Sequence, residues 1–276
     1  MLHFLYNIIY IVLNNNKSFF LYNIIMNYII PIFLIIIFFG ICFQNPIFIT
    51  EFFDEKYDVS ELYVITLGKE ERMLNIKNQQ TKINKKINIF DGVNGLKLNI
   101  DDLVKKNILS DNHNLSKNEN HAKREIGCYL SHLSIYKKIK KDNKDGYTII
   151  FEDDFLINSD NLLEDVKKVI QTLNNNNTNF DFLFLGNSTN NYGTNISDNL
   201  YHVNPNKKLY GLYGYVVNNK NIDKIIDKTK KINHPIDVII QDLSYDKIFD
   251  TYVLYPHLIN HQWSFKSTVD NTENAI

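Results

Sequence analysis

The chain has 276 residues, of which 30 are Lys or Arg and 31 are Asp or Glu, so its formal net charge is -1. This length suits one sizeable domain, or a domain with an added anchor, and the balanced charge gives no general attraction to nucleic acid. With only 2 Cys, the chain is not built on a disulfide framework.

The N-terminal part of the chain differs from the rest because it is strongly apolar. The stretch 19–43 contains no charged residue and exceeds the roughly 20 residues that a membrane-spanning helix needs. Lys17 precedes it and acidic residues follow it, so the positive-inside rule favours a catalytic part on the lumenal or extracytoplasmic side. We therefore predict an apolar anchor at 1–45, with an uncleaved signal-anchor favoured over a cleaved signal peptide, and a polar stem at 46–60.

The next segments alternate between apolar runs and helical patterns. A strand is predicted at 62–67, a helix follows it, and a second strand is predicted at 86–90. A strand, helix and strand in this order is typical of a parallel sheet with crossover helices. The polar region 94–121 predicts loops and short helices over one rim of the sheet, and apolar residues at helical spacing predict a helix over 123–141.

A short apolar run, 147–151, then predicts a buried strand that ends in three acids, Glu152, Asp153 and Asp154. Burying an unpartnered carboxylate costs several kcal/mol, and adjacent carboxylates also repel each other. A hard divalent ion such as Mn²⁺ or Mg²⁺, completed by substrate phosphates, would relieve both costs. The alternative is a solvated acidic turn before the next helix, which Ser159 and Asp160 open.

The second half of the chain continues the alternation. After the acids we expect a helix and a buried strand, then two strands paired with each other, two amphipathic helices and a last strand. The predicted ranges are, in order, 162–173, 180–186, 200–203, 209–217, 221–232, 235–248 and 251–255.

Four landmarks in this order resemble glycosyltransferase family 25, which includes lipooligosaccharide and collagen β-galactosyltransferases. The similarity runs from Leu62 to about Ser267. Its landmarks are the opening strand 63–67 with Arg72, the segment Gly127-Cys128-Tyr129-Leu130-Ser131-His132, the acids with Phe151, and the segment Tyr210-Gly211-Leu212-Tyr213-Gly214-Tyr215. Thr66 and Gly68 stand where the family usually has an Asn and an acidic residue, which leaves a changed donor open.

The resemblance implies an α/β, GT-A-like fold, a Rossmann-related sheet that binds a nucleotide sugar. It places the catalytic domain at 61–268 and a tail at 269–276. The implied reaction is metal-dependent transfer of a hexose, galactose or glucose from a UDP-sugar, to a hydroxyl of a glycan, a lipid-linked glycan or a protein, with inversion. Ligands of open α/β sheets bind beyond the carboxyl ends of the strands, which is where the acids fall.

The roles expected on the donor side follow from the acids and from the resemblance. We expect Asp154 to be a direct metal ligand, Glu152 a ligand of the metal or the ribose, and Asp153 a support. Thr66 and Arg72 stand at the donor side. Arg72 is either a phosphate or base contact or an exposed charge in a first helical turn. Ser131 and His132 are placed near the donor by the resemblance, and a core histidine is the alternative for His132.

The roles expected on the acceptor side rest on later residues. Asp237 begins a helix and is either the base that deprotonates the acceptor hydroxyl or a simple helix cap. His257 and His261 follow the last predicted strand, and we favour His261 as a further metal ligand. Trp263 is either an acceptor platform or a core residue.

Other classes of function remain as alternatives. The first is a catalytically inactive relative that binds a glycan or nucleotide sugar as a scaffold. The second is a divalent-metal phosphotransferase or nuclease, which would normally have a basic groove and more clustered acids. The sequence contains no Gly-rich nucleotide loop, no P-loop and no CxxC zinc pattern.

Overall fold

The computed structural model describes residues 57–189, 192–204, 206–262 and 264–265. The predicted anchor, residues 46–56 of the predicted stem, Trp263 and the predicted tail lie outside these residues. Within the described ranges, no helix is both long enough and apolar enough to cross a membrane.

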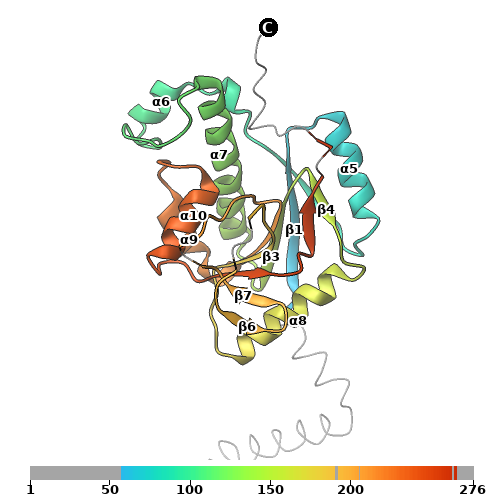
Figure 1. Cartoon of the computed structure of the whole chain (residues 1–276). Coiled ribbons are helices and arrows are strands. Elements are labelled where there is room, and N and C mark those ends of the chain that lie inside the picture. Colours follow the sequence, from blue (N-terminus) through green and yellow to red (C-terminus); the bar gives the residue numbers. More distant parts are fainter. Residues whose placement is uncertain (1–56, 190–191, 205, 263, 266–276) are drawn as a thin grey trace, which may run out of the picture. The chain divides into compact units, whose positions relative to one another are not determined.

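The described part is built on a mixed sheet with strand order β2-β1-β3-β8-β5-β9-β7-β6 (Figure 1). β1 runs parallel to β2 and to β3, whereas β8 lies antiparallel between β3 and β5. The predicted parallel sheet is therefore right for the first three strands and wrong for the sheet as a whole. The strands are β1 (Val59–Thr66), β2 (Asn88–Asp91), β3 (Tyr147–Glu152), β5 (Phe182–Gly186), β6 (Asn195–Ser197), β7 (Leu200–His202), β8 (Gly214–Asn218) and β9 (Thr251–Leu254).

Helices cover both faces of this sheet. One core cluster joins the sheet to α7 (Glu119–Asp142), α9 (Ile222–Thr229) and α10 (Ile236–Tyr245), and the other joins it to α5 (Glu70–Gln80) and α8 (Leu162–Asn175). Successive side chains of β3 alternate between the clusters, which explains why its whole apolar run is buried. The α/β class and the large central sheet fit a GT-A-like fold.

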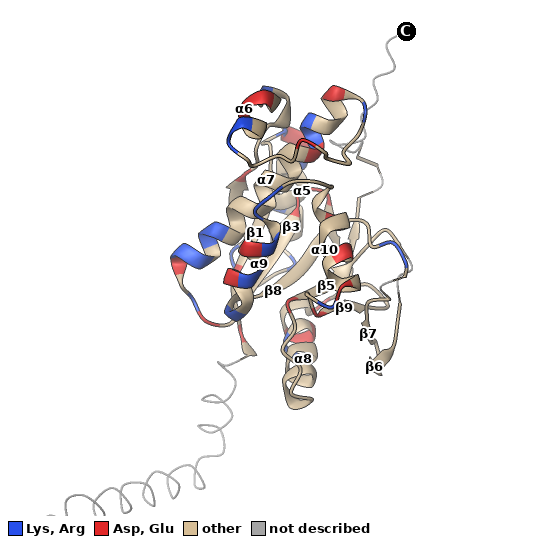
Figure 2. Cartoon of the chain, turned by 90° about the vertical axis from the view of Figure 1, so that its left-hand side faces the viewer, with Lys and Arg blue, Asp and Glu red and all other residues tan. Residues whose placement is uncertain are grey.

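Short elements complete the rim. On the rim near the acids they are α6 (Ile100–Lys105) and the 3₁₀ helix η3 (Gly95–Lys97), so the predicted loop with short helices at 94–121 is observed. At the other end of the strands the 3₁₀ helix η4 (Asn219–Asn221) follows β8. The helix predicted at 221–232 begins as η4 and continues as α9. Acidic and basic residues alternate along α9 and are interspersed on α6 (Figure 2).

The long helix α7 brings residues to the carboxyl ends of β1, β2 and β3. Asn118 caps its start by accepting a hydrogen bond from the His121 amide at 3.0 Å. The helix crosses the loop after β2 where Gly127 meets Gly95, since a Cβ on Gly95 would lie 1.8 Å from the Lys123 carbonyl oxygen. This close approach is available to glycine, and it aligns the middle of α7 with the acidic end of β3.

Two predicted strands do not pair with each other as expected. The run 200–203 supplies β7, which pairs with β6 and β9. Of the run 209–217, only the part from Gly214 onward forms a strand, β8, in the centre of the sheet. Neighbouring strands in sequence usually pair, but β8 is apolar enough to be buried on both faces and therefore takes a central position.

A second, two-stranded sheet was not predicted. It consists of β4 (Phe155–Ile157) and β10 (Ile259–His261), which are antiparallel, so the strand predicted at 251–255 is not the last one. β10 lies directly against Gly186, where a Cβ would meet the Ile259 carbonyl oxygen at 1.7 Å. The pairing of His261 with Phe155 brings the C-terminal part of the chain beside the acids.

Candidate active site

The three acids lie at the carboxyl end of β3. Glu152 is the last residue of the strand, and Asp153 and Asp154 form the turn into β4. Two of the three acids therefore lie beyond the strand, and the alternation of side chains along a strand does not set their directions. The carboxylates are placed instead by the partners of each side chain.

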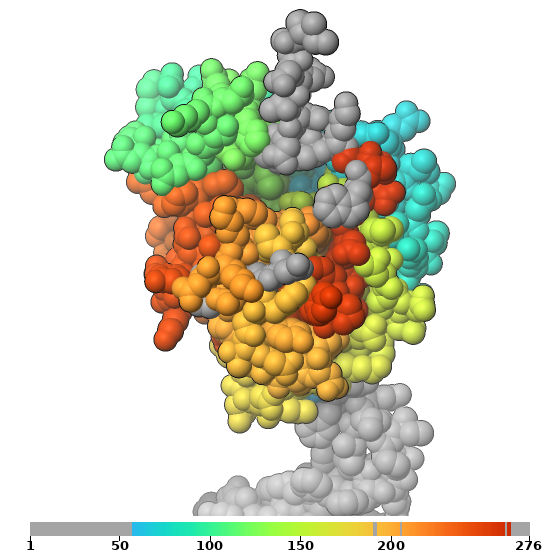
Figure 3. All heavy atoms as spheres, viewed as in Figure 1, coloured from blue at the N-terminus to red at the C-terminus, as the bar shows by residue number. Residues whose placement is uncertain are grey.

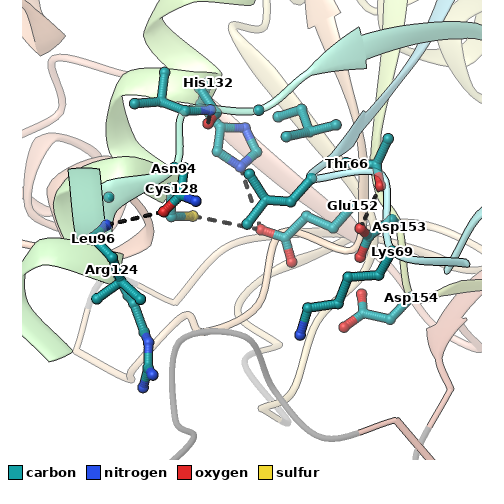
Figure 4. A pocket seen from close by; sticks show the side chains of 16 residues that line it. Thr66, Lys69, Asn94, Leu96, Arg124, Cys128, His132, Glu152, Asp153 and Asp154 are labelled. Atoms are coloured by element: carbon teal, nitrogen blue, oxygen red, sulfur yellow. Dashed lines mark hydrogen bonds and ion pairs between the residues drawn. The ribbon is translucent and has the colours of Figure 1, made fainter. Parts of the chain in front are cut away.

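Two cavities adjoin at this turn, and Cys128, Glu152 and Asp154 line both of them. The smaller cavity, of about 280 Å³, is bounded by the end of β1 and the loop 92–96 (Figure 4). The larger, of about 610 Å³, is bounded by the loop 210–213 and the start of α10. In the space-filling view a recess lies between the green residues of the α6–α7 region and the orange residues below them (Figure 3).

Asp153 is held by two of the predicted donor-side residues. Thr66, at the end of β1, donates its hydroxyl to Asp153 Oδ2 at 2.7 Å and accepts the Gly68 amide at 3.0 Å. Arg72 Nη1 lies 3.3 Å from Asp153 Oδ1 and 2.9 Å from Asp154 Oδ2. Burial raises the pKa of Asp153, while Thr66 and Arg72 counteract that effect.

Arg72 is 1% exposed, so the alternative of a solvent-exposed charge in the first helical turn is wrong. Its guanidinium faces the acids and stacks on the ring of Phe265 at 4.6 Å, and Arg72 is not among the residues that line either cavity. The physical reason is that the first turn of α5 faces the sheet, where two carboxylates need a counter-ion. We infer that Arg72 fixes the acidic turn.

A polar stripe on α5, missed from the sequence, continues this support. Asn75 donates to the carbonyl oxygens of Asp153 and Phe155, both at 3.0 Å, and Gln79 accepts the Ile157 amide at 3.0 Å. Arg72, Asn75 and Gln79 are buried and lie at helical spacing on one face. A polar stripe on the buried face of a helix was the available signal.

The environment of Asp154 disfavours the charged form of its carboxyl group. Its side chain is 20% exposed, and burial together with the Glu152 charge raises its pKa to about 6, although Arg72 opposes this. Within the described ranges its Oδ1 atom is buried without a hydrogen-bond partner. An orphaned carboxylate oxygen beside a second carboxylate fits a divalent cation, because the cation would supply both the missing ligand and the missing charge.

Glu152 is oriented by α7. His132 Nε2 lies 3.3 Å and Cys128 Sγ 3.8 Å from Glu152 Oε1, as the dashed lines in Figure 4 show. No described residue hydrogen-bonds the second oxygen, Oε2. The two carboxylate oxygens therefore differ, since Oε1 is fixed by the helix and Oε2 is free to accept a ligand.

His132 is itself held by a buried pair of tyrosines that was not singled out in the sequence. Its Nδ1 lies 2.7 Å from the Tyr215 hydroxyl, which lies 2.9 Å from the Tyr136 hydroxyl. If Tyr215 donates to Nδ1, Nε2 carries the proton that points at Glu152. His132 is 1% exposed, so it is a buried residue and also reaches the acids.

Ser131 lines the smaller cavity and holds one of its walls in place. Its hydroxyl accepts the Val93 amide at 2.8 Å and donates to the Gly127 carbonyl oxygen at 2.7 Å. These bonds tie the loop after β2 to α7. Lys69 and Arg124, which also line this cavity, were not predicted from the sequence.

Asp237 and His261 both line the larger cavity with Glu152 and Asp154. Asp237 accepts the Val238 amide at 2.9 Å and the Gly211 amide at 3.4 Å, and burial raises its pKa. It therefore both accepts an amide in the first turn of α10 and faces the cavity. The His261 ring packs on Tyr213 at 4.9 Å, and burial lowers its pKa.

His257 is placed elsewhere. It lines a separate depression with Tyr255 and Asn260, and its Nε2 lies 3.4 Å from Asn187 Nδ2. Of the two histidines considered as a further metal ligand, His261 is the one beside the acids.

Residues 59–240 match the family model described as Glycosyltransferase family 25 (LPS biosynthesis protein). The chain belongs to glycosyltransferase family 25. The match covers more than half of the chain and includes the acids, the middle of α7 and Asp237. As a member of this family the chain is a glycosyltransferase, so the cavities beside Glu152 and Asp154 are the candidate active site. No curated protein matches the sequence.

Proposed function

We propose that this family 25 enzyme transfers a hexose from a UDP-sugar, with Mn²⁺ or Mg²⁺, to a hydroxyl of a glycan, lipid-linked or protein acceptor, with inversion. The observation that carries the proposal is that Glu152 and Asp154 line two adjoining cavities at once. A transferase needs its donor and acceptor on either side of the reacting carbon, and this arrangement provides a compartment for each.

The smaller cavity is the proposed donor side. It lies beyond the carboxyl ends of β1, β2 and β3, where open α/β sheets bind nucleotides. Lys69 and Arg124 on its wall offer cations to a diphosphate, and the loop 92–96 is fixed by Ser131. Thr66 and Asp153 close the side near β1 through their mutual hydrogen bond.

The proposed metal ligands are Glu152, Asp154 and His261. Asp154 Oδ1 is buried without a hydrogen bond from a described residue. The described hydrogen bonds to the Glu152 side chain reach Oε1 and leave Oε2 open, and His261 lines the same cavity. A divalent ion there would supply Lewis-acid stabilisation to the departing diphosphate. Arg72, which lines neither cavity, and Asp153, which lines the smaller one, keep the acidic turn in place.

Asp237 is the proposed base. Burial raises its pKa, which makes its carboxylate a stronger proton acceptor than an exposed one. In the proposed step the acceptor oxygen bonds to the anomeric carbon, the bond from that carbon to the phosphate oxygen breaks, and the acceptor proton moves to Asp237. The products are the glycoside and UDP, and inversion follows from the single displacement.

The test is a screen of UDP-, GDP- and CMP-sugars for hydrolysis and transfer, with Mn²⁺ or with chelator, on wild type and on Asp154→Asn. We expect turnover of a UDP-sugar that requires the metal and is lost in the variant. Turnover that ignores both the metal and Asp154 contradicts the mechanism, and binding without turnover favours the inactive, scaffolding alternative.

We also propose that the apolar segment 1–45 anchors the enzyme as a single-pass membrane protein with the catalytic domain on the lumenal or extracytoplasmic side. The uncharged stretch 19–43 supports this proposal. Protease protection in sealed membranes tests it, since digestion of the domain from the cytoplasmic side contradicts the orientation.

A further inference from the structure

A second cluster of ligating atoms lies beside the proposed hard-ion site. Cys128 Sγ, His132 Nε2 and a Glu152 carboxylate oxygen all lie within 4.8 Å of one another. Cys128 and His132 are four residues apart on α7 and therefore project from the same face of the helix. We propose that Cys128, His132 and Glu152 form a binding site for a thiophilic divalent cation, with Zn²⁺ as the matching ion.

The separations in this cluster are close to those of a tetrahedral zinc site. Bond lengths of about 2.3 Å to sulfur and about 2.0–2.2 Å to nitrogen and oxygen separate S from O by about 3.5–3.7 Å and N from O by about 3.3–3.5 Å. The observed separations from Glu152 Oε1 are 3.8 Å to sulfur and 3.3 Å to nitrogen. The third separation, from Cys128 Sγ to His132 Nε2, is within 4.8 Å, so rotation of the Cys128 side chain is what would close the three ligands around Zn²⁺.

The surroundings supply the two other features of such a site. The Tyr215 hydroxyl lies 2.7 Å from His132 Nδ1, which is the outer partner that a zinc-bound histidine requires. Cys128 and Glu152 line both cavities, so the fourth position is open to water or a ligand. Catalytic zinc sites have this arrangement of three protein ligands and an open fourth position, whereas structural sites have four protein ligands.

Binding changes the proton positions in a defined way. The thiol of Cys128 releases one proton and becomes the thiolate ligand. The His132 proton moves to Nδ1 and donates to the Tyr215 oxygen, while the Tyr215 hydroxyl turns toward Tyr136, which lies 2.9 Å away. The buried hydroxyl pair can therefore serve either histidine tautomer.

The ion has a regulatory consequence that rests on the proposed function. Zn²⁺ on this site binds Glu152 Oε1, and the proposed Mn²⁺ or Mg²⁺ binds Oε2 of the same carboxylate, so the two cations lie close enough to repel each other and Zn²⁺ weakens binding of the second ion. Mn²⁺ and Mg²⁺ favour oxygen ligands, whereas a thiolate favours Zn²⁺. Zn²⁺ is therefore an inhibitor of sugar transfer.

The direct test uses Co²⁺ as a spectroscopic substitute for Zn²⁺ on the full chain. The chain has only 2 Cys, so a Cys42→Ser variant leaves Cys128 as the single thiol. We expect one equivalent of Co²⁺ to give a near-ultraviolet thiolate-to-cobalt charge-transfer band, which Zn²⁺ bleaches. The band is lost in Cys42→Ser/Cys128→Ser, and Tyr215→Phe weakens Co²⁺ affinity by about 10–100-fold.

X-ray absorption at the zinc edge of the Cys42→Ser protein gives a second measurement that needs no change at the site. One sulfur ligand at about 2.3 Å is expected. A Cys42→Ser protein with the wild-type thermal unfolding transition but no thiolate band and no zinc–sulfur distance overturns the proposal, as does a band that persists without Cys128.

Mn²⁺-dependent donor turnover, measured on the same preparation, separates this proposal from the proposed function. A cobalt band without turnover of any donor leaves the site standing and removes the inhibitory consequence. Zn²⁺ that bleaches the band without inhibiting an active enzyme contradicts that consequence.

Discussion

Buried carboxylates lie at both ends of the inner strands of the sheet, and nearby positive charges compensate them to different degrees. Asp181, 0% exposed, precedes β5 at one end and accepts Lys224 Nζ at 2.6 Å and the Asp250 amide at 2.8 Å. At the opposite end of these strands, the guanidinium of Arg72 is shared by Asp153 and Asp154, and Glu152 faces His132. Burial raises the pKa of Asp181 and of Asp154. The next-largest influence on Asp154 is the charge of Glu152, which raises its pKa further, whereas on Asp181 it is the hydrogen bond from Lys224, which lowers its pKa.

The comparison shows how structural and functional acids can be told apart. Asp181 Oδ2 accepts Lys224 Nζ and the Asp250 amide. Its Oδ1 has no hydrogen bond from a described residue but lies 2.6 Å from Lys224 Nζ, so one ammonium group balances this one carboxylate. The acidic turn after β3 also has such an oxygen, Asp154 Oδ1, but there the guanidinium of Arg72 faces two carboxylates with Glu152 close by, so an excess of negative charge remains. We propose that a cation from outside the chain balances this excess.

The largest effect is expected for Asp154→Asn, which removes part of the excess. We predict that kcat for sugar transfer falls by about a thousandfold, as for the loss of a main electrostatic contact in a transition state. The thermal unfolding temperature does not fall, because the substitution removes a charge that burial and Glu152 disfavour. Steady-state kinetics measures kcat, and calorimetry measures the unfolding temperature. A variant that is less stable but fully active would show that Asp154 is a structural acid and not a functional one.

Asp237→Asn tests the other acid of the larger cavity. We predict a drop in kcat of about a hundredfold with little change in the KM of the donor, since the residue acts on the acceptor proton. Asp246→Asn, at the exposed end of the same helix, is the matched control and leaves kcat unchanged. Equal effects of the two substitutions would assign Asp237 to the helix alone.

Asp181→Ala tests the carboxylate whose charge is compensated within the fold. The substitution leaves the Asp250 amide without its acceptor and Lys224 without its partner, so we predict a loss of about 2 kcal/mol in the free energy of unfolding. Chemical denaturation measures the loss, and kinetic constants at a temperature where the variant is folded stay at wild-type values. Loss of activity in a fully folded variant would contradict the assignment of a structural role to Asp181 and a functional role to the acids after β3.

The smallest expected effect concerns pH. Because the pKa of Asp154 is about 6, Mn²⁺ affinity falls by about tenfold per pH unit below that value as a proton competes for the carboxylate. The free energy of unfolding depends on pH in the opposite direction. Folded Asp154 keeps its proton to higher pH than the unfolded chain, so its contribution to stability falls as the pH rises from about 4 to about 6. Calorimetric titration with Mn²⁺ and unfolding at several pH values check both trends.

The sequence predicted what depends on local pattern. The buried strand 147–151, the helices at α7 and α8 and the acidic end of β3 all follow from apolar spacing, and the four landmarks indicated the family that the comparison shows. The family resemblance also named Asp237 and His132, which the fold places beside the acids.

What the sequence could not show depends on contacts between distant segments. β4 and β10 are three residues each, too short to have a pattern, yet their pairing brings His261 to the acids. The burial of Arg72 follows from the packing of α5, and the support of His132 by Tyr215 joins residues 83 positions apart. These contacts arise only when the whole chain is folded.

The most direct measurement is anomalous diffraction at the manganese edge from crystals soaked with Mn²⁺ and UDP. The account predicts one manganese peak in contact with Glu152 and Asp154, with the diphosphate in the smaller cavity. A crystal that binds UDP without an ion at these acids, or that binds Mn²⁺ and UDP away from this turn, would contradict the claim that the unbalanced charge holds the leaving group.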